Sequence, residues 1–412
     1  MKNLEITRRD FGMVVLGGFV GAAASRMLCI PPVEAGAPDF TIAIIPDPQG
    51  LAGTCPDKTG RYYTAMMKWI VNHKHLVLTS SEPSFDANIK AVIGVGDYLQ
   101  SPIRDQVKNA EAAWTVLDTN KIAFITPPGN NDYVGNHPSS RSNLGEHFKT
   151  GYFSAKNRSE VYGAGIDLGG GDMAYWVGSQ DATGANTAVK FVISGTRMLI
   201  LGMDFFAGNT AWEWAHDVMM KNSDCECYIT THAWLTIDGK QFERKDVHGP
   251  HSYSMARPPY SNSAAEAWST LEVNTWPNLS GIFCGHDTFK DQPLGWQRAA
   301  IKSDSTRRQT VHVQQLFVNS QQLDIACSAS ASRATGAGQI ANVFLLSRRP
   351  ALGLLEGRMI STHTGNWFKS ESPSLTGGIS WSEHEKLLFS VPFTGLSTER
   401  AVSARTPAAI AG

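Results

Sequence analysis

The sequence contains few cysteines, six in 412 residues. One of them, Cys29, falls in an N-terminal segment that we expect to be cleaved, which leaves an odd number. A small, odd count in a chain of this length excludes a scaffold held together by disulfides. If the protein is exported, one disulfide is conceivable, but the sequence does not determine its pairing.

The sequence also lacks an excess of charge of either sign. Its 36 Lys and Arg residues nearly balance 37 Asp and Glu residues, so the formal net charge is −1. This balance gives no general electrostatic reason to bind nucleic acid or an anionic membrane, so any bound phosphate would need a local site. The composition, 42% hydrophobic and 18% charged, is that of a globular protein with one large α/β domain or two modest ones.

Long hydrophobic runs are missing except near the N-terminus, where Phe11 to Ala24 follow Arg8 and Arg9. The polar residue, arginine pair and Phe11 resemble a twin-arginine export signal, and a small-residue cleavage pattern ends at Ala35. A membrane anchor is the alternative, but the run is short for a stable span. We predict a signal peptide over residues 1–35, recognition by the twin-arginine translocation machinery, and a periplasmic or secreted protein without a stable membrane span in its mature form.

Apolar β-branched runs alternate with helical patterns along the next part of the chain. Phe40 to Ile45 is such a run, and Tyr62 to Val71 has apolar residues at helical spacing. The alternation predicts an α/β fold with a parallel-rich sheet and covering helices. Segments near residues 312–322, 342–347 and 357–364 are expected to be late strands of a second sheet.

The last part of the chain has little to bury. After about Phe393 it consists mainly of Ala, Ser, Thr and Arg, a composition typical of a disordered tail. We therefore divide the chain into the signal peptide, a main domain over residues 36–370, and a C-terminal extension over residues 371–412 that we expect to be partly disordered.

Polar residues follow five of the expected strands at the point where each strand ends. These positions are Asp47-Pro48-Gln49, Gly96-Asp97, Gly129-Asn130-Asn131-Asp132, Thr231-His232 and Gly285-His286-Asp287. In open α/β sheets ligands bind beyond the carboxyl ends of the strands. Carboxylate, amide and imidazole groups are ligands for divalent Mn, Fe, Zn or Mg. Each position alone is ordinary turn chemistry, but the ordered set predicts a metal site.

The series resembles the calcineurin-like metallophosphoesterases, whose motifs run Asp-x-His, Gly-Asp, Gly-Asn-His-Asp, His and Gly-His-x-His. The resemblance covers roughly Phe40 to Phe368. It implies a two-sheet β-sandwich flanked by helices, with two metals that share a bridging aspartate. Carried over to this sequence, Asp97 is the bridging residue, and Asn130, His232 and His286 complete the second metal position.

The first metal position departs from the family pattern. Asp47 is retained, but Gln49 replaces the usual His in an Asp-x-Gln variant, and Thr288 stands where the last His is expected. Gln49 could ligate through its amide oxygen or make a hydrogen bond beside the metal. The resemblance therefore implies one or two divalent metal ions.

Asn131 occupies the place of the family's catalytic His, and Asp132 would orient that residue. An amide donates a hydrogen bond but cannot act as a general acid near neutral pH. Asn131 is therefore expected to contact phosphate oxygen or to shape the loop, with Asp132 holding the loop. His137 is close enough in sequence to be a substitute acid.

The sequence leaves two functions open. The first is an exported, metal-dependent phosphoesterase that hydrolyses a small-molecule phosphomonoester or phosphodiester, with no nucleic acid partner evident. The second is a weakly active or non-catalytic protein that binds a metal or another ligand on the same scaffold. The missing acid and the altered first position support the second.

Overall fold

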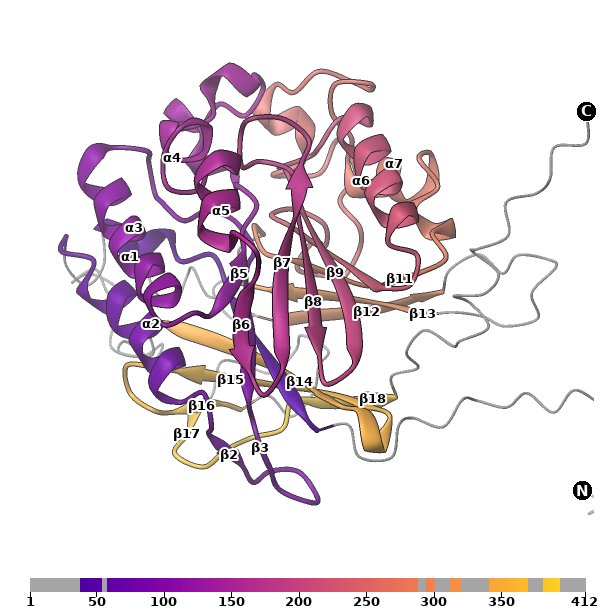
Figure 1. The fold of residues 1–412 in the computed structure, drawn as a ribbon. Coiled ribbons are helices and arrows are strands. Elements are labelled where there is room, and N and C mark those ends of the chain that lie inside the picture. The colour runs from indigo at the N-terminus through magenta and orange to yellow at the C-terminus, as the bar shows by residue number, and fades with distance from the viewer. Residues whose placement is uncertain are drawn as a thin grey trace, which may run out of the picture. The chain divides into compact units, whose positions relative to one another are not determined.

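The computed structural model describes residues 38–53, 58–287, 294–300, 312–319, 341–369 and 381–392. The predicted signal peptide, including Arg8 and Arg9, lies outside these residues, and so does Thr288. The described chain has a mixed α/β fold in which two eight-stranded sheets carry most of the strands (Figure 1).

The first sheet has the strand order β17-β16-β15-β14-β1-β4-β5, and β18 pairs with β15 beside this path. Strands β1, β4 and β5 are parallel, whereas β14 pairs antiparallel with β1. The strands are β1 (Phe40–Ile45), β4 (Ile89–Gly94), β5 (Ala123–Ile125), β14 (Asn342–Arg349), β15 (Leu354–Ser361), β16 (Trp367–Phe368), β17 (Trp381–Ser382) and β18 (Phe389–Pro392). A separate hairpin is formed by β2 (Val77–Leu78) and β3 (Phe85–Asp86).

The second sheet has the strand order β12-β13-β11-β10-β9-β8-β7-β6. Its central strands β9, β10, β11 and β13 are parallel. The strands are β6 (Ile166–Gly169), β7 (Asp172–Ser179), β8 (Thr187–Ile193), β9 (Thr196–Met203), β10 (Glu226–Thr231), β11 (Leu279–Cys284), β12 (Leu294–Ala300) and β13 (His312–Val318).

The late strands divide between the two sheets. Strand β13 joins the second sheet, as the sequence predicts, but β14 and β15 extend the first sheet beyond β1. Hydrophobicity identifies these segments as strands without revealing their partners. Two short strands of the predicted C-terminal extension, β17 and β18, also belong to the first sheet.

Apolar side chains from both sheets share one hydrophobic cluster. Ile42 and Ile44 of β1 contribute to this cluster together with Phe191 of β8 and Ile200 of β9. Because successive side chains of a strand point to opposite faces, the intervening residues of β1 belong to a different cluster, which includes helical side chains. Both faces of β1 are therefore covered, which explains why five of its six residues are apolar.

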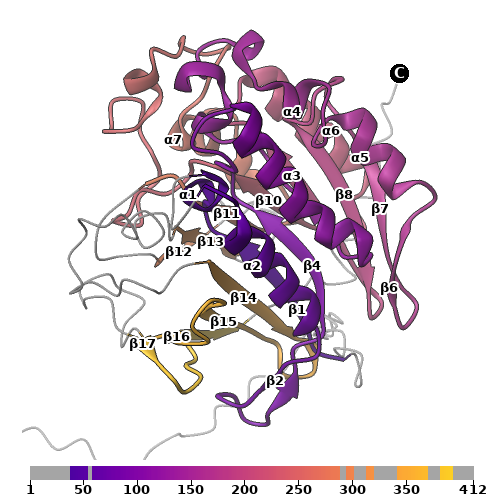
Figure 2. The same cartoon turned by 90° about the vertical axis from the view of Figure 1, so that its left-hand side faces the viewer.

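Helices cover the outer faces of the two sheets (Figures 1 and 2). Helix α2 buries Tyr63, Met66, Met67 and Ile70, which recur at the three- and four-residue spacing of one helix face. Helices α2 and α3 pack on the first sheet, and α6 and α7 on the second. The helices are α1 (Gln49–Gly53), α2 (Arg61–Asn72), α3 (Arg104–Thr119), α4 (Glu146–Lys149), α5 (Ala155–Tyr162), α6 (Asn209–Lys221) and α7 (Ala264–Ser269).

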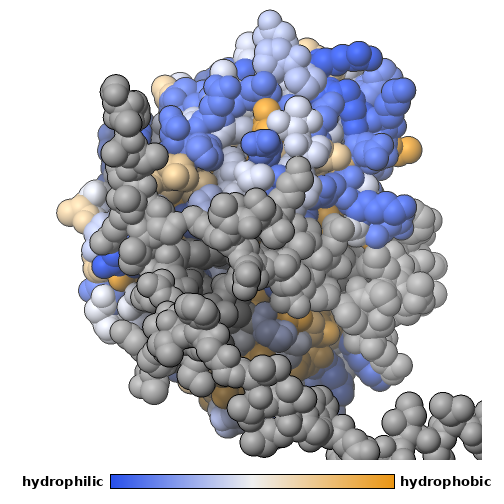
Figure 3. Space-filling view, turned by 90° about the vertical axis from the view of Figure 1, so that its right-hand side faces the viewer, coloured by the Kyte–Doolittle hydropathy of each residue, from blue (hydrophilic) through white to orange (hydrophobic). Residues whose placement is uncertain are grey.

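The described surface is mainly hydrophilic where Figure 3 shows it in its upper half, with single hydrophobic residues scattered among polar ones. Scattered apolar residues of this kind are normal on a folded protein. Among the described residues, no helix is both long enough and apolar enough to cross a membrane.

Candidate metal centre

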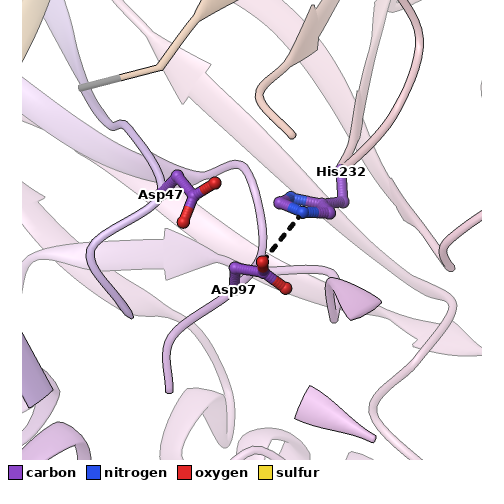
Figure 4. Close-up of side chains that lie close together, drawn as sticks. All are labelled: Asp47, Asp97 and His232. Atoms are coloured by element: carbon purple, nitrogen blue, oxygen red, sulfur yellow. Dashed lines mark ion pairs between the residues drawn. The ribbon is translucent and has the colours of Figure 1, made fainter. Parts of the chain in front are cut away.

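Three buried side chains converge from the carboxyl ends of strands in both sheets (Figure 4). Asp47 follows β1, Asp97 follows β4, and His232 comes directly after β10. Each offers one ligand atom, and these atoms all lie within 4.8 Å of one another. Two carboxylates and an imidazole at this spacing could hold a divalent metal ion.

The backbone is unusual at two residues of this group, Asp47 and Asp97, and also at His286, which follows β11. Asp47 has φ 39°, Asp97 has φ 53° and His286 has φ 76°, all in the left-handed region that non-glycine residues rarely adopt. Such conformations cost free energy and cluster at functional sites. Each of these residues lies within three positions of the end of its strand, so its side chain stays near the edge of the sheet.

Two glycines of the motif series are required by close approach. A Cβ at Gly129 would lie 2.1 Å from Asp97 Oδ1, and one at Gly96 would lie 2.7 Å from His232 Nδ1. Both distances are far below van der Waals contact, so either substitution would displace a candidate ligand. The Gly-Asp and Gly-Asn pairs of the sequence therefore reflect packing around Asp97 and His232.

His232 is oriented by the backbone of the first sheet. Its Nδ1 lies 2.8 Å from the carbonyl oxygen of Val95, which can only accept a hydrogen bond, so Nδ1 carries a hydrogen. Its Nε2 lies 3.2 Å from Asp97 Oδ2. Burial disfavours the imidazolium, but the Asp97 carboxylate outweighs that effect and raises the pKa of His232. In the neutral ring Nε2 is an acceptor, so a proton or a metal cation must lie between it and Asp97.

Asp97 is held ionised at the centre of the group. Burial alone would raise the pKa of its carboxyl, but His232 and the backbone N–H of Asn131 lower it below its ordinary value. That N–H donates to Asp97 Oδ1 at 2.8 Å. A buried carboxylate kept charged in this way is suited to cation binding.

His286 lies beside His232, with the two ring centroids 4.8 Å apart. Its Nε2 donates to the carbonyl oxygen of His248 at 3.0 Å, which leaves Nδ1 as the acceptor. Burial, followed by the neighbouring His232, lowers the pKa of His286 to about 3. His286 is therefore neutral at physiological pH, the form in which imidazole binds a metal.

Gln49 and Asn131 are joined to each other and to Asp97. The amide nitrogen of Asn131 lies 2.5 Å from Gln49 Oε1 and 2.8 Å from Asp97 Oδ2. Gln49 is buried at the start of α1, and Asn131 lies in the short 3₁₀ helix Asn130–Asp132. Of the two roles considered for Gln49, the structure thus contains the hydrogen bond.

Asn130 uses its amide differently. Its nitrogen donates to Asn136 Oδ1 at 2.7 Å, which fixes the orientation of the group. Its oxygen is buried and has no hydrogen-bond partner within the described part of the chain. A buried acceptor left in this state fits the ligand role expected for Asn130.

Asp132 faces a histidine that sequence reasoning missed. Asp132 Oδ2 accepts from the backbone N–H of Gly129 at 2.8 Å, and Oδ1 lies 3.4 Å from Nε2 of the buried His147. His147 is fifteen positions further along, in a region without clear periodicity, so no spacing pointed to it. His137, considered as a substitute acid, is exposed.

Two further residues border the group. Asn319, which follows β13, donates to Asp47 Oδ2 at 3.2 Å, and the hydroxyl of Tyr253 lies 3.5 Å from His286 Nε2. Asn319 directly follows β13 (His312–Val318), but the sequence predicts a strand that continues to residue 322, so Asn319 is not at a predicted strand end. Tyr253 lies in the long loop after β10 and carries no such pattern.

Neither models of known protein families nor curated proteins match this chain. The structural case for a metal site therefore rests on the buried group Asp47, Asp97 and His232, with His286 and Asn130 as neighbouring acceptors. Carboxylate oxygens combined with neutral imidazole fit Zn, Mn or Fe.

Proposed function

We propose that this protein is a metal-dependent phosphoesterase of the calcineurin-like superfamily, which hydrolyses a phosphomonoester or phosphodiester. The observation that carries the proposal is the convergence of Asp47, Asp97 and His232 from three strand ends. These are members of the ordered motif series on which the family resemblance rests. Mixed α/β architecture with two sheets and outer helices is compatible with that fold.

A divalent ion bound here would polarise the phosphoryl oxygens and lower the pKa of a water molecule that attacks phosphorus. Asp47 and Asp97 supply the negative charge that attracts the cation into a buried site. The Val95 carbonyl holds His232 in the tautomer that presents Nε2 to Asp97. The chain thereby preorganises its ligands before substrate arrives, so little reorganisation accompanies the reaction.

Asn131, at the place of the family's catalytic His, cannot protonate the leaving oxygen. Both hydrogens of the Asn131 amide are directed to Gln49 and Asp97, and an amide has no titratable proton near neutral pH. Tyr253 borders the group, and burial, followed by the charges of Asp97 and Asp47, raises the pKa of its hydroxyl. Tyr253 thus stays protonated and can donate a hydrogen bond. We expect activated aryl esters to be hydrolysed faster than alkyl esters.

Both amide hydrogens of Asn131 are bound to protein acceptors, and this favours the second candidate, a non-catalytic metal- or ligand-binding protein. Its amide is already satisfied by protein acceptors, so it has no free hydrogen for a phosphate oxygen. A protein of this kind would bind metal with no measurable turnover of any ester.

A metal-reconstituted substrate screen separates the two candidates. The full chain would be stripped of metal, loaded with Mn²⁺, Zn²⁺ or Fe²⁺, and assayed on aryl and alkyl phosphomonoesters and phosphodiesters. The enzyme proposal predicts turnover that is lost in His232→Ala and retained in His216→Ala, a control in the exposed part of α6. Metal binding without turnover of any ester would favour the second candidate.

Export is a separate part of the proposal and rests on Arg8 and Arg9. We propose translocation by the twin-arginine machinery into the periplasm or the medium. Replacement of both arginines by lysine should retain the protein in the cytoplasm. Normal export of that double variant would show that the arginine pair is incidental.

A further inference from the structure

The amide of Asn131 is fixed by what surrounds it. Its nitrogen Nδ2 lies 2.8 Å from Asp97 Oδ2 and donates a hydrogen bond to it. The second hydrogen of that nitrogen needs an acceptor, and Gln49 Oε1 supplies it at 2.5 Å. The two acceptors, Asp97 Oδ2 and Gln49 Oε1, therefore hold the amide nitrogen of Asn131 between them.

Asn131 also has little freedom to move away. Its backbone N–H donates to the other oxygen of Asp97, so the residue contacts both oxygens of one carboxylate. The turn that carries it is closed by a hydrogen bond from Asp132 N to the Gly129 carbonyl and by one from Gly129 N to the Asp132 carboxylate. Asn131 is 8% exposed.

The two sides of Asp97 consequently differ in polarity. On the side of His232, an imidazole Nε2 faces Asp97 Oδ2 at 3.2 Å, and a neutral ring offers a lone pair there. On the side of Asn131, the space between Asp97 and Gln49 is filled by an N–H₂ group. The lone pairs on the His232 side attract a cation. The amide hydrogens of Asn131 point at Gln49 Oε1 and Asp97 Oδ2, so they repel a cation from the other side.

Size leads to the same conclusion. A metal ion bound to both Gln49 Oε1 and Asp97 Oδ2 would lie about 2.0–2.6 Å from each oxygen. The amide nitrogen of Asn131 already lies at 2.5 Å and 2.8 Å from the same two oxygens. The ion and the nitrogen would therefore compete for nearly the same position.

We propose that the Asn131 amide replaces one of the two metals implied by the family resemblance, so that the centre binds a single divalent cation on the His232 side of Asp97. Gln49 then positions Asn131 and does not ligate metal. Asn131 is a positioning residue, which holds the Asp97 carboxylate toward His232. This inference rests on the metal site of the proposed function and specifies its stoichiometry.

Metal stoichiometry of the full chain tests the inference. After metal removal, the protein would be titrated with Mn²⁺ or Zn²⁺ by calorimetry, and its metal content would be measured by elemental analysis after dialysis. One equivalent per chain is expected. Two equivalents in the wild-type protein would overturn the inference and leave the proposed function standing. No binding at all would overturn both.

A matched pair of variants locates the effect at Asn131. Asn131→Asp replaces the N–H₂ group by an oxygen of similar size and should allow a second equivalent to bind. Asn136→Asp adds the same charge five positions further along, where the amide oxygen accepts a hydrogen bond from Asn130 Nδ2 at 2.7 Å and a carboxylate oxygen can do the same, so this variant should remain at one equivalent. The inference would be overturned if both variants behaved alike.

If the carboxylate of Asn131→Asp prevents folding, Asn131→Ala provides a second test. It removes the two amide hydrogens without adding charge, so a second, weaker equivalent should appear. A folded Asn131→Ala protein, as judged by circular dichroism, that binds only one equivalent would overturn the inference.

Discussion

The two sides of Asp97 come from different parts of the fold. The Asn131 side consists of loops of the first sheet alone, those after β1 and β5. The His232 side requires the loop after β10, which belongs to the second sheet. On the Asn131 side, the amide hydrogens of Asn131 are bound to Gln49 and Asp97. On the His232 side, His232 Nε2 and Asp97 Oδ2 face each other across the two sheets. A cation bound there would therefore link the sheets, and substitutions on the His232 side should weaken metal binding more than substitutions on the Asn131 side.

Asp97→Asn should have the largest effect, because it disturbs both sides at once. His232 and Asn131 would lose their charged acceptor, so we expect metal binding to fall below detection. The free energy of unfolding should drop by about 1–3 kcal/mol. Elemental analysis and urea unfolding measure the two effects.

Asp204→Asn is the matched control for that variant. Asp204 is also a buried aspartate directly after a strand, and it accepts a hydrogen bond from Tyr133 Oη at 2.7 Å. It is not a member of the ligand group, so its metal content should equal that of the wild-type protein. Equal metal loss in both variants would mean that general destabilisation explains the result.

His232→Ala should abolish the His232 side while leaving the Asn131 side intact. We expect the dissociation constant for Mn²⁺ or Zn²⁺ to rise by more than about 100-fold, beyond the 10–100-fold typical of residues that only support a ligand. Calorimetric titration measures this constant. An unchanged constant would remove His232 from the metal site.

The metal affinity should also depend on pH. Because Asp97 raises the pKa of His232, acid converts this ring to an imidazolium at a higher pH than for an ordinary histidine. A metal ion must displace that proton, so affinity should be full above the raised pKa and should fall about tenfold per pH unit below it. Titrations in buffers of different ionisation enthalpy should detect release of roughly one proton per metal ion in the acid range. An affinity that does not change with pH would contradict this account.

Gln49→Ala should have the smallest effect on metal binding. It removes the acceptor of one Asn131 hydrogen and leaves the His232 side unchanged, so one equivalent should still bind with similar affinity. The free energy of unfolding should fall by about 1–3 kcal/mol, because a buried N–H loses its partner. A loss of metal comparable to that in His232→Ala would show that Gln49 is a ligand.

Much of the site was predictable because each of these strands is an apolar run that is followed by polar residues. The apolar run Phe40–Ile45 stops before Asp47, and the other strand ends follow the same rule. Parallel pairing of β1 and β4 brings Asp47 and Asp97 to the same edge of the first sheet, and the packing of the two sheets brings His232 beside them. Asn319 also follows a strand, but the pattern of residues 312–322 does not show that this strand ends at Val318.

The remaining contacts depend on how loops fold, which hydrophobic periodicity does not encode. Nothing in the sequence indicates that Asn131 donates to Gln49, 82 positions earlier, or that Asp132 faces His147. The sequence likewise did not predict which strands pair with β14 and β15, because antiparallel strands of either sheet have the same apolar pattern. The sequence therefore predicted which residues converge but not which of them bond to each other.

Anomalous diffraction from crystals grown with Mn²⁺ or Zn²⁺ tests the central claim most directly, because it locates each bound ion. We predict one anomalous peak, about 2.0–2.4 Å from His232 Nε2 and from an oxygen of Asp97, with the Asn131 amide still between Gln49 and Asp97. A peak between Gln49 and Asp97, or the absence of any peak beside His232, would contradict the account.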